Sequence, residues 1–276
     1  MTAAESTPGA KSGNGMGAAG AGSLTGAGTL AGTGSPLVEG QHLHQPITDR
    51  LAIDIIDGGW PVGSSLTLED IQNKFGVSRT VAREAARALE SADAVTIRRR
   101  VGLVAQSPES WAALNPQVIQ WKLHSTQRRQ ELLSLTELRL AIEPAAAEGT
   151  ARRAPLDVKA KFPVLAVEMR RHGESGDLNR FHELDIEFHS LLLKSSGNEL
   201  FAALAHIVAT ILRGRVEINM YPQRPAPEAL DAHDAVADAI WKGDPARARD
   251  AMHDIVDEVS CALATDQINA DQTDAD

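Results

Sequence analysis

Cysteines and long apolar runs are scarce in this chain of 276 residues. The single cysteine, Cys261, leaves no intramolecular disulfide to form, which fits a reducing compartment and indicates a cytoplasmic protein. No run of about 18 consecutive apolar residues occurs, so we expect no membrane-spanning helix and no membrane partner. The sequence therefore favours neither a disulfide-stapled secreted protein nor a membrane protein.

The two ends of the chain lack the bulky side chains that fill a core. Residues 1–44 are rich in glycine, alanine, serine and threonine, and residues 265–276 are polar and acidic. Such segments bury too little apolar surface to offset the entropy of ordering them. Residues 1–44 also lack the basic start and continuous apolar stretch of a signal peptide. We expect a disordered arm and a disordered acidic tail.

The chain has fewer basic than acidic residues, and this difference is distributed unevenly along the sequence. The net charge is −10, but residues 45–105 carry eight basic and eight acidic residues, whereas residues 106–276 carry 18 and 27. The first of these segments is neutral overall, and the excess acid lies downstream of it. Any binding to nucleic acid would use a few placed cations rather than general attraction.

Residues 64–105 begin with a pattern typical of two helices joined by a tight turn. Leu68, Ile71 and Phe75 recur at spacings of three and four, so one helical face is apolar. Gly76 can then adopt a positive φ, and Ser78 can cap the helix that follows. This pattern predicts a helix-turn-helix.

The second of these helices has two distinct faces. Arg79, Arg83 and Arg87 lie four residues apart, on a face where guanidinium groups can reach phosphates and guanine edges. The buried face is predicted to contain Val81, Ala82, Ala85, Ala86 and Leu89.

A basic hairpin is expected next. Residues 95–97 and 103–105 are predicted as short strands, with the tip at residues 98–102. Three arginines at a hairpin tip suit insertion near a DNA groove. The alternative is a solvated turn beside an ordinary helical hairpin. We interpret residues 45–105 as a winged-helix domain that binds duplex DNA.

Downstream of the hairpin the pattern becomes helical throughout. Residues 106–130 are predicted as a linker and a short helix, with Pro116 in its first turn. Residues 131–264 show helical periodicity punctuated by glycine and proline. The predicted fold is mainly α with a small β wing, in which an N-terminal winged helix-turn-helix precedes an all-α antiparallel bundle of six or seven helices.

One helix of the bundle presents a spacing suited to metal. Asp185 and His189 are one turn apart, so their side chains project from the same face, and His233 lies on a later helix. A carboxylate and two imidazoles suit Zn²⁺ or another divalent ion. The alternative is a set of ordinary hydrogen-bonded side chains, because isolated Asp-x-x-x-His is common.

The chain resembles the FadR branch of the GntR superfamily of bacterial transcription regulators, whose effector domain is of the FCD type. Residues 77–85 (VSRTVAREA) match the recognition-helix signature, and residues 138–144 (LRLAIEP) resemble the opening of the effector domain. Residues 185–189 (DIEFH) resemble the metal motif, and residues 232–244 resemble the helix that carries the third metal ligand. The four motifs occur in the expected order.

The resemblance implies a role for each part of the chain. Asp185, His189 and His233 would hold a divalent metal, most simply Zn²⁺, while Arg139 and Glu143 would belong to the effector site. The guanidinium of Arg139 would pair with an effector carboxylate; the alternative is a surface salt bridge to Glu143. The residues expected to meet operator DNA are Ser78, Arg79, Thr80, Arg83, Arg98, Arg99, Arg100 and Gly102. A homodimer located at the nucleoid is implied.

Two positions depart from the family pattern. Where four-ligand members carry another histidine this chain has Ile255, and His253 is two residues short of that position. The site would therefore offer three protein ligands and leave the rest to water or effector. Leu68 and Glu69 also replace the usual Glu-Arg at the start of the first predicted helix of the helix-turn-helix.

Residues 114–121 (LNPQVIQW) resemble the subgroup that responds to sugar acids such as gluconate and galactonate. The chain is thus interpreted as a repressor, not an enzyme, that leaves its operator when such an acid binds. Two alternatives remain open at this stage. One is a regulator of the same class that senses another carboxylate or a fatty acyl ligand without metal, and the other is a metallohydrolase.

Overall fold

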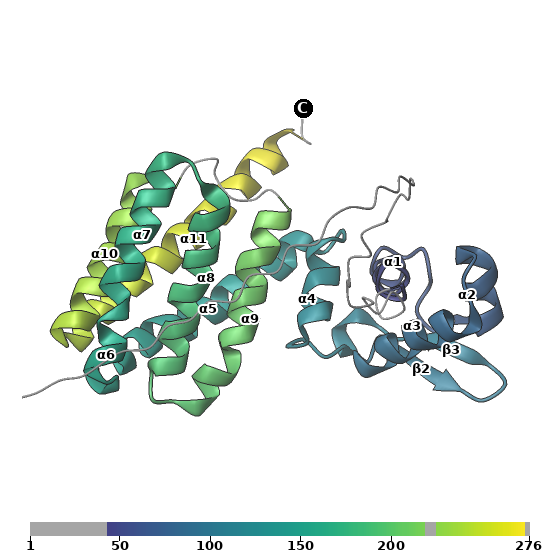
Figure 1. Ribbon diagram of the computed structural model, residues 1–276. Coiled ribbons are helices and arrows are strands. Elements are labelled where there is room, and N and C mark those ends of the chain that lie inside the picture. The colour runs from purple at the N-terminus through teal and green to yellow at the C-terminus, as the bar shows by residue number, and fades with distance from the viewer. Residues whose placement is uncertain (1–42, 219–224, 274–276) are drawn as a thin grey trace, which may run out of the picture. The chain divides into compact units, whose positions relative to one another are not determined.

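The computed structural model describes residues 43–218 and 225–273, with side chains through Ser260 (Figure 1). Helices predominate, and three short strands form one small sheet in the N-terminal part of the described chain. This is the predicted fold class. No helix in the described ranges is long and apolar enough to cross a membrane.

The N-terminal domain is a winged helix. Its sheet is antiparallel with the strand order β1-β3-β2, so β3 is the central strand. Helix α1 and strand β1 were not predicted. The elements are α1 (Gln45–Ile56), β1 (Ser65–Leu66), α2 (Leu68–Phe75), α3 (Arg79–Ser91), β2 (Val95–Arg98) and β3 (Gly102–Ala105).

Local capping fixes both ends of α2 and the start of α3. The Thr67 hydroxyl accepts a hydrogen bond from Asp70 N at 3.1 Å, and Asp70 Oδ2 accepts one from Thr67 N at 2.7 Å. Gly76 has φ of 65° and ends α2, while the Ser78 hydroxyl accepts a hydrogen bond from Val81 N. The predicted turn is confirmed, since both Gly76 and Ser78 act as expected.

Small side chains let α3 pack closely in the core of this domain. Four members of its predicted buried face are almost fully buried, whereas Val81 is half-buried. They pack with Leu51 and Ile55 of α1 and with Ile71 of α2. This packing leaves the arginine face of α3 toward solvent. The four are Ala82, Ala85, Ala86 and Leu89.

The β2–β3 hairpin forms the predicted wing. Arg98 pairs with Gly102, so the tip consists of residues 99–101. Arg100 has φ of 68°, a conformation that costs a non-glycine residue energy. Gly102 has φ of 106°, and a Cβ at this position would collide with the carbonyl oxygen of Leu66 in β1. Glycine is required there for β3 to lie against β1.

Helix α4 (Pro116–Leu123) follows a short 3-10 turn, Pro108–Ser110. Asn115 caps it by accepting a hydrogen bond from Gln117 N. Its Trp121 packs edge to face on Trp111 with ring centroids 5.9 Å apart, and Gln117 donates a hydrogen bond to Gln45. The hydrogen bond between Gln117 and Gln45 joins α4 to α1.

The C-terminal part is a helical bundle in which the long helices α5 and α11 pack together (Figure 1). Seven helices are described here, at the upper end of the predicted range. Helix α5 contains Pro144, which has no N–H for an intrahelical hydrogen bond. The helices are α5 (Arg128–Arg153), α6 (Leu156–Lys159), α7 (Lys161–Ser175), α8 (Leu178–Ser195), α9 (Glu199–Glu217), α10 (Pro227–Lys242) and α11 (Pro245–Thr273).

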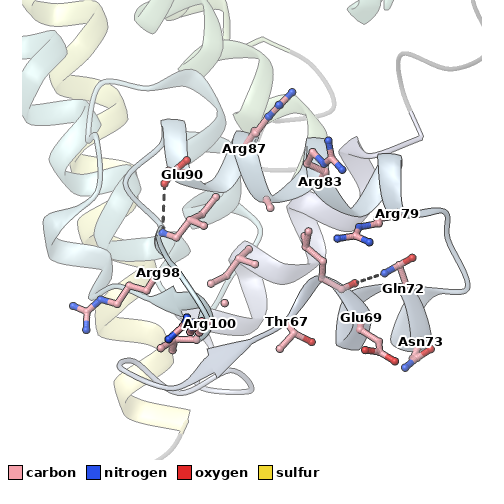
Figure 2. Close-up of a pocket in the computed structure, with 16 residues that line it drawn as sticks. Thr67, Glu69, Gln72, Asn73, Arg79, Arg83, Arg87, Glu90, Arg98 and Arg100 are labelled. Atoms are coloured by element: carbon pink, nitrogen blue, oxygen red, sulfur yellow. Dashed lines mark hydrogen bonds between the residues drawn. The ribbon is translucent and has the colours of Figure 1, made fainter.

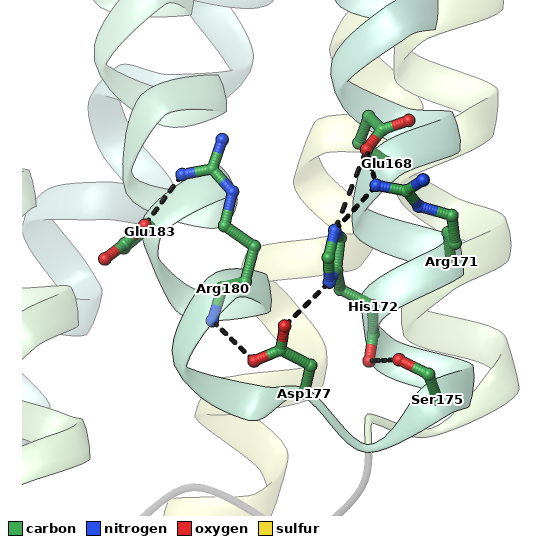
Figure 3. A network of polar contacts seen from close by, with 7 residues as sticks. All are labelled: Glu168, Arg171, His172, Ser175, Asp177, Arg180 and Glu183. Carbon is green, nitrogen blue, oxygen red and sulfur yellow. Dashed lines mark hydrogen bonds and ion pairs between the residues drawn. The ribbon is translucent and has the colours of Figure 1, made fainter.

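Polar contacts fix the turn between α7 and α8 (Figure 3). The side chain of Asp177 caps α8 by accepting a hydrogen bond from Arg180 N, and its other oxygen lies 3.0 Å from His172 Nδ1. His172 belongs to α7, so one carboxylate joins the two helices. This junction sets the start of α8, the helix that carries Asp185 and His189.

The predicted ends of the chain differ in part from the structure. Residues 265–273, predicted within the disordered tail, continue α11 as helix. This stretch contains no glycine or proline, so an existing helix can extend through it. Residues 274–276, and residues 1–42 of the predicted arm, lie outside the described residues.

Candidate functional site

Helices α2 and α3 and the wing enclose a groove of about 900 Å³ (Figure 2). Three arginines come from α3 and two from the wing. Because the wing folds back beside α3, cations far apart in the sequence line the same groove. The arginines are Arg79, Arg83, Arg87, Arg98 and Arg100.

Most of these arginines are not neutralised by the protein. Arg87 pairs with Glu84 at 2.9 Å, but within the described residues no ion pair engages Arg79, Arg83, Arg98 or Arg100. All five are exposed. Exposed, uncompensated guanidinium groups suit phosphate and guanine, the acceptors that duplex DNA offers.

The structure brings some of the predicted DNA-contacting residues together and leaves others beside the groove. Arg79, Arg83, Arg98, Arg100 and Gly102 line it. Ser78 serves as the cap of α3, and Thr80 and Arg99 are exposed but do not line the groove. The prediction omitted three uncharged polar lining residues, whose signal was weak because they lie outside the recognition helix. These are Thr67, Gln72 and Asn73.

The second site lies inside the bundle and joins α8 to α10. Asp185 and His189 of α8 and His233 of α10 have 3%, 1% and 5% of their surface exposed. Asp185 Oδ1 is 3.4 Å from His189 Nε2 and 3.2 Å from His233 Nε2. The three side chains offer ligand atoms within 4.8 Å of one another. The sequence-predicted triad is therefore brought together in three dimensions.

The outward nitrogen of each imidazole has its own neighbour. His233 Nδ1 lies 2.7 Å from the carbonyl oxygen of Ala229, and His189 Nδ1 lies 2.7 Å from Glu143 Oε2. An oxygen acceptor at this distance favours a proton on Nδ1, as a hydrogen bond in His233 and as a close ion-pair contact, not aligned as a hydrogen bond, in His189. Both Nε2 atoms, if the rings are neutral, then direct lone pairs toward the carboxylate of Asp185, an arrangement that a cation would stabilise.

Two of the three ligand-atom separations also fit a tetrahedral ion. Ligand atoms about 2.0–2.1 Å from zinc at tetrahedral angles lie about 3.3–3.4 Å apart, close to the two distances from Asp185 Oδ1. His233 Nε2 is buried and makes no aligned hydrogen bond to any described group. The residues present therefore fit a divalent metal.

Opposite charges shift the pKa values of this cluster. Burial alone would raise the pKa of Asp185, but the neighbouring imidazoles of His189 and His233 outweigh it and hold the value well below its usual range. Burial likewise opposes a charge on His189, but the Glu143 and Asp185 carboxylates outweigh it and raise the pKa to about 9. Without metal, His189 is a cation at neutral pH.

Arg139 forms a buried ion pair. Its Nε and Nη2 donate to the two oxygens of Glu143 at 2.6 and 3.2 Å, and the two residues are 2% and 0% exposed. Burial opposes the charge of Glu143, yet Arg139 and His189 lower its pKa to about 2. The salt bridge from Arg139 to Glu143, considered as an alternative role for Arg139, is present. It is buried rather than on the surface, and Glu143 also contacts a residue of the metal cluster.

The position of the family's fourth ligand is apolar. Ile255 is buried in the bundle core, and His253 is exposed. As the helical spacing predicts, His253 points away from the buried face. Among the described residues, those that could hold an ion together are thus Asp185, His189 and His233.

A winged helix with a basic groove, joined in one chain to a helical bundle with a buried cluster of ionisable groups, defines the class of ligand-responsive DNA-binding regulators. Comparison with known proteins places the chain further. Residues 43–104 match the gntR family of bacterial regulatory proteins, and residues 134–258 match the FCD domain. The chain belongs to the GntR family of transcription regulators, as predicted, and carries an FCD domain. The family comprises regulators, not enzymes.

Individual relatives agree with this assignment. The chain is 29% identical over 199 residues to the galactonate operon transcriptional repressor of Escherichia coli, covering 70% of this chain and 86% of that protein. It is 26% identical over 216 residues to the uncharacterised regulator YieP of the same organism, covering 75% and 90%. Among solved structures, Lar of Listeria monocytogenes matches 81% of this chain and 97% of its own, with 19% identity and a TM-score of 0.52, which supports the fold alone.

Proposed function

We propose that this protein is a dimeric transcriptional repressor that a sugar acid, an aldonate such as galactonate or gluconate, releases from its operator. The observation that carries the proposal is the buried Asp185, His189 and His233 cluster beside a buried arginine, in a chain that also presents a basic winged helix. The likeness to a galactonate operon repressor supports the choice of ligand class.

The winged helix is proposed to bind operator DNA. Arg79 and Arg83 of α3 would contact bases and phosphates in the major groove, and Arg98 and Arg100 of the wing would contact the adjacent backbone or groove. Glu69 lines the same groove and carries a charge that DNA repels, so the contribution of α2 is expected to be weaker than that of α3. Two such domains in a homodimer would match two half-sites.

The bundle is proposed to hold Zn²⁺ on Asp185, His189 and His233. The ion would add a positive centre with open coordination positions, which suits the carboxylate and α-hydroxyl oxygens of an aldonate. Arg139 would contribute the second positive group for the effector carboxylate, held in place by Glu143. Effector binding would favour an arrangement of the dimer that no longer matches the operator.

Binding to DNA upstream of the protein's own gene tests the proposal, with and without a panel of aldonic acids. Tight, salt-dependent binding released by one acid is expected. DNA binding that no acid alters would keep the DNA-binding role but contradict the sugar-acid assignment. This is the result expected if the effector is an apolar acyl ligand. A failure to bind any DNA fragment would contradict the repressor role itself.

Three variants separate the roles. Arg139→Ala is expected to abolish release by the acid while operator affinity is retained, and release that persists would remove Arg139 from the effector site. His233→Ala is expected to weaken zinc binding by at least about 100-fold, because three protein ligands become two. His253→Ala, on an exposed face of α11, is the matched control and is expected to leave zinc affinity unchanged.

A further inference from the structure

Glu143 of α5 contacts both halves of the proposed effector site with one carboxylate. Oε1 accepts a hydrogen bond from Arg139 Nε at 2.6 Å, and Oε2 accepts one from Arg139 Nη2 at 3.2 Å. Oε2 also lies 2.7 Å from His189 Nδ1. The side chain of Glu143 has no exposed surface, so water does not screen either interaction.

The contact with His189 determines how that ring can bind a metal. A carboxylate 2.7 Å from Nδ1 favours the tautomer with its proton on Nδ1, which leaves the lone pair on Nε2. Nε2 is the nitrogen that faces Asp185 Oδ1. Glu143 therefore selects the nitrogen that lies inside the cluster and holds the ring in that orientation.

The contact with Arg139 makes this selection sensitive to what else Arg139 binds. The guanidinium withdraws charge from the Glu143 oxygens through two hydrogen bonds. An anion that shares Arg139 weakens this withdrawal, so Glu143 becomes a stronger acceptor for His189 and His189 a better ligand.

We propose that Glu143 is a positioning residue that couples the effector arginine to the metal ligand His189, so that metal and effector bind cooperatively. The inference rests on the proposed function, in which the cluster binds metal and Arg139 binds the effector. It assigns Glu143 a second role, toward the metal, beyond holding Arg139. Because coupling is reciprocal, metal raises effector affinity by the same factor as effector raises metal affinity.

The first half of this coupling is the effect of Glu143 on zinc affinity. Chelator competition on the full-length protein, with zinc and no effector, tests it. Glu143→Gln keeps the shape but removes the charge, and it is expected to weaken zinc binding by about 10- to 100-fold. Glu148→Gln is the matched control on the same helix, since Glu148 pairs with Arg152 and Arg249 outside the cluster. It is expected to leave zinc affinity unchanged.

A double-mutant cycle tests whether Arg139 acts through Glu143. Arg139→Gln is expected to change zinc affinity by about threefold or more when Glu143 is present, and by less than that in the Glu143→Gln protein. An effect of Arg139→Gln on zinc affinity that depends on Glu143 identifies Glu143 as the bridge. Equal effects in both backgrounds would overturn the coupling.

The tautomer of His189 gives a readout that a purely structural role would not change. In the zinc-loaded wild-type protein, nitrogen NMR is expected to show a protonated Nδ1 and a metal-bound Nε2. This signature is expected to weaken in Glu143→Gln and to be partly restored in Glu143→Asp, which also serves if Glu143→Gln does not fold. A folded variant with unchanged tautomer and zinc affinity within about threefold of wild type would overturn the proposal.

The outcomes separate this inference from the proposed function. Wild-type protein that binds no zinc, or binds it independently of His233, contradicts the metal site itself and the coupling with it. Zinc binding that requires His233 but ignores Glu143 contradicts the coupling alone. Adding galactonate to the zinc titration then tests cooperativity: tighter zinc binding in wild type and no change in Glu143→Gln is the expected result.

Discussion

The indole Nε1–H of Trp121 donates a 2.7 Å hydrogen bond to Asp49 Oδ1, across 72 residues of sequence. Trp121 lies on α4 and is 2% exposed, while Asp49 lies on α1 and also accepts a hydrogen bond from Gln45. A buried indole N–H needs an acceptor, because leaving it unpaired costs free energy. This hydrogen bond therefore makes α4 part of the framework that supports the winged helix.

Trp121→Phe is expected to lower the free energy of unfolding by about 1 kcal/mol, since the substitution removes the donor but retains an aromatic ring. Urea denaturation of the full-length protein measures this change. Trp241→Phe is the control: Trp241 is 45% exposed, so its replacement is expected to change stability by less than about 0.5 kcal/mol. Equal losses in the two variants would show that the hydrogen bond contributes nothing specific.

The wing offers a pair of variants that separate stability from DNA binding. Arg100 has φ of 68°, whereas Arg99, its neighbour at the tip, does not have a positive φ. Arg100→Gly relieves the backbone cost and is expected to be more stable than Arg99→Gly by about 1 kcal/mol. Equal stability of the two variants would contradict this account of the tip.

For operator affinity, the expected order of the same two variants is the opposite of their order in stability. Arg100 lines the groove and Arg99 does not. Arg100→Gly is therefore expected to weaken operator binding more and to reduce the slope of log affinity against log salt by about 0.9 for the lost phosphate contact. Binding titrations at several salt concentrations check it, and a larger loss for Arg99→Gly would place the DNA elsewhere along the tip.

Local patterns in the sequence predicted the winged helix well because its turns depend on single residues. Gly76 and Ser78 act at the positions where the pattern placed them, and the Arg98–Gly102 pair closes the predicted hairpin. Strand β1 was missed because two residues carry no periodicity, and it forms only by pairing with β3. Its presence depends on tertiary contacts that the local sequence does not encode.

The metal cluster shows the same limit at the level of a site. Helical spacing placed Asp185 and His189 on one face, the sequence offered His233 on a later helix, and the family resemblance supported the set of three. The contact of His189 with Glu143 could not be read from spacing, because it depends on how α5 and α8 turn about their axes when they pack. The contact of His233 with the Ala229 carbonyl is made within α10, between residues four apart. The resemblance supplied Arg139 and Glu143 as site residues; their burial emerged only from the packed bundle.

Zinc is expected to stabilise the folded protein because the unfolded chain does not assemble the three ligands. At free zinc 100-fold above the dissociation constant the gain is about 2.7 kcal/mol, and chelator treatment is expected to remove it. Thermal denaturation with and without chelator measures the difference. His233→Ala is expected to show little dependence on zinc, whereas the exposed-residue variant His253→Ala is expected to behave as wild type. A chelator effect of equal size in His233→Ala would locate the zinc outside the cluster.

The affinity for zinc is expected to depend on pH through His189. Glu143 and Asp185 outweigh burial and raise its pKa to about 9, so below that pH the metal-free protein holds a proton that zinc must displace from Nε2. Zinc affinity therefore falls as pH falls, by about tenfold per unit between pH 8.5 and 7, and it levels off above about pH 9. Had burial alone set this pKa, the value would lie below 6.5 and affinity would be flat over the same range. Chelator competition at several pH values distinguishes the two cases. Glu143→Gln removes one of the two carboxylates that hold the proton, so its affinity is expected to level off at a lower pH than that of the wild type.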